Sequence, residues 1–127
     1  ALVVDAARTR ALLMHHRKLG LWLEMGGHAD GEGDLAAVAL REAFEESGIG
    51  GLRLEPGPAD VDVHRVQPPG EAAHLHFDVR YVAVAPEGAV EVANEESLEL
   101  RWFTLAEIEA SIDDPSTLRL ARLGLAP

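Results

Sequence analysis

One segment near the middle of the chain constrains the fold most, because it contains the start, the body and the end of a helix. Asp34 is a residue type that commonly caps a helix, and Leu35–Ser47 carries apolar and charged side chains at helical spacing. Gly48 then supplies the left-handed residue at which helices often end. A glycine-rich loop, Gly26–Gly33, comes before Asp34. The segment therefore predicts a loop followed by one amphipathic helix.

Apolar and alternating runs on both sides of this helix predict strands. A Thr104–Glu107 capping box and the pair Asp114-Pro115 predict two short helices near the C-terminus, the last of which ends at Gly124. The order of strands, helix, strands and helices predicts the α/β class, with a mixed sheet covered by helices. Strands are expected at 1–5, 10–16, 21–24, 61–67, 73–85 and 98–103, and the 73–85 strand has Leu75, Phe77, Val79 and Tyr81 on one face.

Length, cysteine content and charge limit what this chain can do. It has 127 residues, so we expect one domain over residues 1–127. It contains no cysteine, which excludes disulfides, thiolate catalysis and cysteine-bound metal sites. The formal net charge is −11, which disfavours non-specific binding to nucleic acid. Any phosphate group that the protein handles therefore needs a local positive charge, and a divalent cation can supply it.

Other classes of protein are excluded by what the sequence lacks. No uninterrupted apolar run approaches the roughly 20 residues that span a bilayer, and no secretion signal is visible, so we expect a cytoplasmic location without membrane contact. Asp30, Glu32 and Asp34 resemble the start of an EF-hand loop. Leu35 and Arg41, however, stand where that loop requires glycine and glutamate. No Walker-type phosphate-binding loop occurs.

Three glutamates gather on one side of the predicted helix. On a helical wheel Glu42, Glu45 and Glu46 share a sector about 100° wide, and at these spacings their charges repel one another. Two interpretations remain open at this point. The three carboxylates form either a solvated acidic face or a hard-oxygen site for Mg²⁺ or Mn²⁺. The opposite stripe is apolar and consists of Ala36, Ala39, Leu40, Ala43 and Phe44.

The helix and the loop before it together resemble a known family. Gly27, the loop after it, and the run Arg41-Glu42-Ala43-Phe44-Glu45-Glu46-Ser47-Gly48-Ile49 are similar to the Nudix box, G-x5-E-x7-R-E-U-x-E-E-x-G-U, in which U is a bulky aliphatic residue. One position departs from the pattern, because Gly33 stands where the box has its first glutamate. The segments around Trp22, HLHFDVRY and ELRWFTLAEI also resemble sequences usual for that fold.

The resemblance implies a Nudix-like α/β/α sandwich and a hydrolytic activity. The implied reaction is the metal-dependent cleavage of a nucleoside diphosphate linked to another moiety, with Mg²⁺ or Mn²⁺ as cofactor and a small nucleotide as substrate. The departure at Gly33 motivates an alternative, a Nudix-like module that binds a nucleotide without cleaving it. A homodimer is left open.

The resemblance also implies the residues of the site. Glu42 would act as a metal ligand or as the general base, and Arg41 would orient the glutamate carboxylates. Glu45 would take part in catalysis as well as in metal binding. The implied metal ligands are Glu42, Glu45, Glu46, the carbonyl of Gly26, and Glu96.

Further residues are expected to contact the substrate. His76 lies on the polar face of the 73–85 strand with His74 and Asp78, and a hydrogen-bonding role is favoured there over a separate metal site. Trp22 and Trp102 are expected to pack against the core. The expected substrate-binding residues are Arg17, Gly27, His28, His76 and Glu95.

Overall fold

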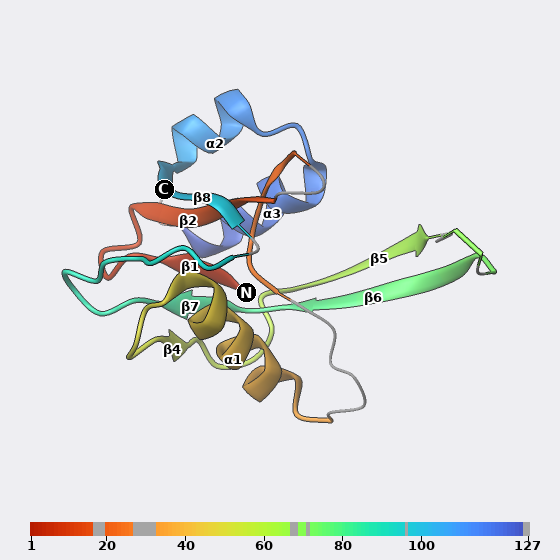
Figure 1. Ribbon diagram of the computed structural model, residues 1–127, viewed down its shortest axis with the longest axis horizontal. Helices are drawn as coiled ribbons and strands as arrows, with labels where there is room; N and C mark the ends of the chain where they lie inside the picture. The colour runs from red at the N-terminus through yellow and green to blue at the C-terminus, as the bar shows by residue number, and fades with distance from the viewer. Residues whose placement is uncertain (17–19, 27–32, 67–68, 71, 96, 126–127) are drawn as a thin grey trace.

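The computed structural model describes residues 1–16, 20–26, 33–66, 69–70, 72–95 and 97–125. Figure 1 shows a central sheet with helices on both sides and one long hairpin that extends away from the rest. The elements in chain order are β1 (Leu2–Val4), β2 (Arg10–His16), β3 (Trp22–Leu23), α1 (Leu35–Ser47), β4 (Arg53–Leu54), β5 (Asp60–Val66), β6 (His74–Arg80), β7 (Val82–Val84), β8 (Ser97–Thr104), α2 (Leu105–Ser111) and α3 (Pro115–Gly124).

The main sheet is mixed, as the sequence predicts. Its strands follow the order β3-β2-β1-β7-β4, and β8 also pairs with β2. The β1 and β7 strands run parallel, whereas β1 with β2, β2 with β3, β2 with β8 and β4 with β7 are antiparallel. The α/β class is therefore confirmed, and β4 is a strand that the sequence analysis missed.

Alternation along the strands divides the core between the two faces of this sheet. Leu2 and Val4 belong to the cluster on the side of α2 and α3, which contribute Ile108 and Leu120. Val3, between them, belongs to the cluster on the side of α1. Figure 1 shows α2 and α3 on one side of the sheet and α1 on the other. The period of two along β1 therefore explains why helices cover both faces.

The helix ends follow the predicted capping signals. The Asp34 carboxylate accepts from the Ala37 backbone N–H, and Gly48 ends α1 in the left-handed region with φ of 70°. Thr104 and Glu107 form the complete capping box of α2. Asp114 caps α3. These local predictions are confirmed because each depends only on residues within a few positions of the helix end.

The strand predicted over 73–85 is wrong as a single element. It divides at Tyr81 into β6, which pairs with β5, and β7, which joins the main sheet beside β1. The Tyr81 carbonyl accepts from the Leu2 backbone N–H at 2.8 Å, which marks the point where the chain enters the main sheet. The alternation of the sequence ends at Tyr81, where an uninterrupted apolar run to Ala85 begins, and such a run is typical of a strand buried on both faces.

The β5–β6 hairpin presents apolar side chains to solvent. Figure 1 shows it reaching beyond the rest of the molecule. Leu75 and Phe77 are 56% and 66% exposed, and Val63, paired with Phe77, is 49% exposed. The predicted apolar face of this strand is therefore present but contributes little to the core. Across the described residues, no helix combines the length and the apolar character that crossing a bilayer requires.

Candidate functional site

The buried side of α1 differs from the predicted apolar stripe. Leu40 and Phe44 belong to that stripe but are 36% and 53% exposed. Ala43 is fully buried and packs with the cluster on this side of the sheet. Glu46 and Ser47 are buried as well. The helix is therefore rotated so that its acidic sector partly faces the protein, and the small Ala43 side chain lets it lie close to the sheet.

The three glutamates of α1 consequently differ in environment. Glu46 is only 6% exposed. The Glu42 side chain is 21% exposed, and the Glu45 side chain is 54% exposed. A solvated acidic face thus describes Glu45 but not Glu46. Burying a carboxylate is costly unless its charge is compensated, so an inward-facing glutamate needs partners in the protein or a bound cation.

Carboxylates from two segments lie around the first residue. Ala1 and Met25 exchange two backbone hydrogen bonds, at 2.5 and 3.2 Å, which bring the segment before the glycine-rich loop beside β1. Burial lowers the pKa of the Ala1 amino group, while the charges of Glu24, Glu46 and Glu42 act in the opposite direction. The charge of Arg80 also acts on this group and adds to the lowering.

Arg41 lies between two of the α1 carboxylates. Its guanidinium is 3.9 Å from a carboxylate oxygen of Glu42 and 4.0 Å from one of Glu45. The Arg41 side chain is half exposed, so these pairs add little to the stability of the fold. Arg41 can nevertheless limit the orientations that both carboxylates adopt.

Glu24 is a partly buried acidic residue that is not among the site residues predicted from the sequence. Its carboxylate accepts from Arg80 at 3.0 Å and from the Thr117 hydroxyl at 2.9 Å. Arg80 also donates to Asp60 at 2.6 Å. A charged residue between the apolar Leu23 and Met25 was the signal available in the sequence.

A cavity of about 760 Å³ opens beside Glu24. Its walls come from β3, the base of the β5–β6 hairpin and the segment between α2 and α3. Trp22, Asp62, Asp78, Asp114 and Arg119 are among its lining residues. The walls are rich in hydrogen-bond acceptors, with one aromatic ring and one guanidinium.

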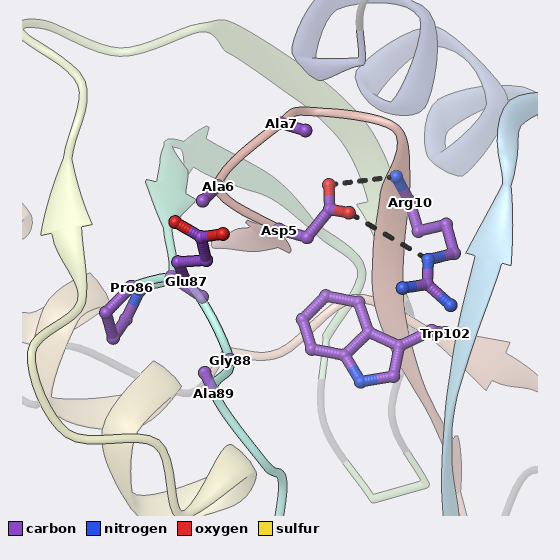
Figure 2. A pocket seen from close by; sticks show the side chains of 10 residues that line it. Asp5, Ala6, Ala7, Arg10, Pro86, Glu87, Gly88, Ala89 and Trp102 are labelled. Atoms are coloured by element: carbon purple, nitrogen blue, oxygen red, sulfur yellow. Dashed lines mark hydrogen bonds and ion pairs between the residues drawn. The ribbon is translucent and has the colours of Figure 1, made fainter.

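A second cavity, of about 470 Å³, lies near the β1–β2 turn. Figure 2 shows Asp5 bound to Arg10 on one side of it and the Trp102 indole nearby. Among the predicted site residues that the structure describes, none lines this cavity. Trp102 also packs against the core, and Trp22 does so on the other face, as predicted.

The structure describes some of the remaining predicted site residues and not others. Gly26 and Glu95 are described and exposed. Arg17, Gly27, His28 and Glu96 lie outside the described residues, as does the side chain of His76. Within the described part of the chain, no three histidine or acidic side chains lie close enough together to hold a metal ion. One of the predicted metal ligands, Glu96, lies outside the described residues.

The fold of this chain is similar to that of several solved structures. The chain is 18% identical to the E. coli dihydroneopterin triphosphate pyrophosphohydrolase, with a TM-score of 0.77 over 98% of this chain and 92% of that chain. It is 21% identical to a NUDIX-family hydrolase from Clostridium perfringens, with a TM-score of 0.76 over 94% and 89%. It is 18% identical to a C. elegans Ap4A hydrolase, with a TM-score of 0.74 over 96% and 89%.

These identities are low, so the three likenesses show the fold alone. A comparison with curated proteins gives no match. The NUDIX domain family matches residues 1–122, which is nearly the whole chain and includes the box-like segment of α1. The chain therefore belongs to the NUDIX domain family.

Proposed function

We propose that this protein is a divalent-cation-dependent pyrophosphohydrolase that cleaves a nucleoside diphosphate linked to another moiety. The single observation that carries the proposal is the orientation of α1, which buries Glu46 and partly buries Glu42. These two glutamates occupy box positions of the family to which the chain belongs. Two acidic side chains turned toward the protein on one helical face repel each other, and a reaction that uses them explains their presence.

The chemistry of these donors fits a hard divalent cation. Glu42, Glu45 and Glu46 offer carboxylate oxygens from adjacent helical turns, and Gly26 offers a carbonyl. Mg²⁺ keeps several waters and needs few protein ligands, so a partial set of carboxylates is sufficient. The buried charge of Glu46 is also the kind of charge that a bound cation compensates.

The residues of α1 would have different roles in the reaction. When bound, Mg²⁺ or Mn²⁺ neutralises phosphate oxygens and lowers the pKa of water. Glu46 and Glu45 would hold the cation, and Glu42 would accept the proton of the attacking water or serve as a further ligand. Arg41 would keep the carboxylates of Glu42 and Glu45 in place, which its contacts with both support.

The cavity beside Glu24 would receive the organic part of the substrate. Glu24 lines it, and its volume of about 760 Å³ is in the range of small-molecule sites. Its acceptors suit the hydroxyl and amino groups of a nucleoside or sugar. Arg17, Gly27, His28, His76 and Glu95 remain our proposed contacts to the phosphates and to the rest of the substrate.

Gly33 motivates a second candidate function, a module that binds a nucleotide without cleaving it. The residue is exposed, and it replaces the first glutamate of the box. Such a module needs the cavity but not the inward carboxylates of α1. The burial of Glu46 therefore favours the enzyme.

Product analysis separates these two functions. The protein is incubated with nucleoside triphosphates, dinucleoside polyphosphates and nucleotide sugars, with and without Mg²⁺, and the products are resolved by ion-exchange chromatography. The enzyme predicts Mg²⁺-dependent cleavage at a phosphoanhydride bond of at least one class. Binding without product in every class, at saturating Mg²⁺, would support the non-cleaving module.

A further inference from the structure

The loop after β7 is fastened to the last turn of α1. The backbone N–H of Val92 donates to the Ser47 carbonyl at 2.7 Å. The Asn94 side-chain amide donates to the Glu45 carbonyl at 3.3 Å. We call residues 91–94 the clasp, because they hold this loop against the helix.

The clasp donates hydrogen bonds to helix-end carbonyls that have no partner within the helix. The last carbonyls of a helix lack intrahelical partners and carry a partial negative charge. That charge disfavours the carboxylates of Glu45 and Glu46, which stand on the same turn. By donating to the carbonyls of Glu45 and Ser47, the clasp offsets part of the unfavourable field. It therefore supports an acidic group at the end of a helix that would otherwise repel it.

Gly48 allows the clasp to come this close. A Cβ at this position would lie 2.9 Å from the Val92 Cβ and 3.0 Å from its carbonyl oxygen. The φ of 70° at Gly48 also disfavours any other residue. The glycine that ends the box thus has a second role besides ending the helix, because it makes room for Val92.

The other end of the clasp is attached to β8. The Trp102 Nε1–H donates to a carboxylate oxygen of Glu91 at 2.8 Å. The clasp is therefore held at both ends, by β8 through Glu91 and by α1 through Asn94. The indole also provides a fluorescent reporter at one of these attachments.

We propose that Asn94 is a positioning residue for the divalent cation site. This inference rests on the proposed function. By donating to the Glu45 carbonyl, Asn94 holds the clasp against the turn that carries Glu45 and Glu46 and thereby fixes the position of that turn.

Direct measurement of cation binding tests this role. Free Mn²⁺ is followed by electron paramagnetic resonance during titration of wild-type protein, Asn94→Ala and Val90→Ala. Val90 is the matched control, because it lies just before the clasp and is 74% exposed. We expect Asn94→Ala to raise the dissociation constant about threefold to tenfold, the effect of losing one hydrogen bond. The control should stay within about twofold of wild type, and kcat at saturating Mg²⁺ should change little in both variants.

A second pair of variants tests the attachment at Glu91. Glu91→Gln keeps an acceptor for Trp102 and should bind Mn²⁺ as wild type does. Glu91→Ala removes the acceptor and should weaken Mn²⁺ binding and change the tryptophan emission. This comparison separates the loss of the hydrogen bond from the loss of the charge.

Two outcomes would overturn the proposal, and they are distinguishable. A lower melting temperature of Asn94→Ala with an unchanged Mn²⁺ dissociation constant would make Asn94 a structural residue only. Absence of Mn²⁺ binding by the wild-type protein, together with no metal-dependent cleavage of any nucleotide, would overturn the proposed function as well.

Discussion

Arg80 and Glu24 form a buried ion pair, with 3.0 Å between a guanidinium nitrogen and a carboxylate oxygen and only 6% of the Arg80 side chain exposed. The same guanidinium donates to the Asp60 carboxylate and to the Ser116 carbonyl. It thus joins the base of the β5–β6 hairpin to α3 and to the segment before the glycine-rich loop. A two-stranded hairpin is only marginally stable alone, so this attachment holds it in place.

Arg80→Ala should destabilise the protein strongly. The substitution leaves the carboxylates of Glu24 and Asp60 together without their shared cation, and breaking a buried pair in this way costs about 3–5 kcal/mol. Urea denaturation measures the change in the free energy of unfolding. Arg122→Ala is the control, because Arg122 pairs with Glu109 on the surface, and it should cost less than about 1 kcal/mol. Equal effects of the two variants would contradict the anchoring role of Arg80.

The stability should fall at acidic pH in part through Asp60. Hydrogen bonds from Arg80 and then from Arg119 hold the pKa of Asp60 below its ordinary value. A lowered carboxyl pKa in the folded state adds stability that is complete above the unfolded value of about 4 and is lost as the pH falls through the folded value. Asp60→Asn should therefore lose less stability than wild type between about pH 5 and pH 2. Parallel curves of unfolding free energy against pH would contradict this contribution.

Local signals predicted the ends of the elements well, whereas the relation of distant segments could not be predicted. Asp34 and Gly48 mark α1 correctly because a cap depends on neighbouring residues. The rotation that exposes Phe44 and buries Glu46 depends on how the helix packs on the sheet. A wheel assumes that apolar residues face inward, and a functional site is where that assumption fails.

The same limit applies to the strands and to the network around Glu24. The pattern over 73–85 indicates extended chain and changes from alternating to continuously apolar at Tyr81, but the strand with which β7 pairs is β1, far away in the sequence. Thr117, which binds Glu24, is likewise distant in sequence. The box spacing, in contrast, gave Glu42 and Glu46 as candidates because it is local.

Glu42→Gln should reduce turnover at least ~100-fold. The substitution preserves the shape of the side chain but removes its charge and its ability to accept a proton, and loss of a general base has this scale. Steady-state kinetics on the best substrate of the panel measures kcat, and the Michaelis constant should change much less. Glu109→Gln, on the surface of α2, should keep wild-type turnover. Near-wild-type turnover of Glu42→Gln would exclude it as both base and essential ligand.

Gly33→Glu should restore the acidic residue of the box without damage to the fold. A Cβ at Gly33 meets no atom of the described residues within 4 Å, and its φ is not in the left-handed region. We expect a melting temperature close to that of wild type and a lower Mg²⁺ concentration for half-maximal activity. Gly33→Gln is the matched variant without charge and should leave the metal requirement unchanged. If both variants need as much Mg²⁺ as wild type, the missing glutamate has no bearing on metal affinity.

The proposed divalent cation site on α1 is tested most directly by the effect of Mg²⁺ on thermal unfolding of wild-type protein and Glu46→Gln. For a dissociation constant of about 1 mM, ~10 mM Mg²⁺ should add roughly 1.4 kcal/mol, a rise in melting temperature of about 3–6 °C. NaCl at the same ionic strength is the reference. Glu46→Gln should lose most of this rise, and it should melt above wild type without metal because one of the mutually repelling charges of α1 is gone. Coincident melting curves of wild-type protein in Mg²⁺ and in matched NaCl would contradict the cation site.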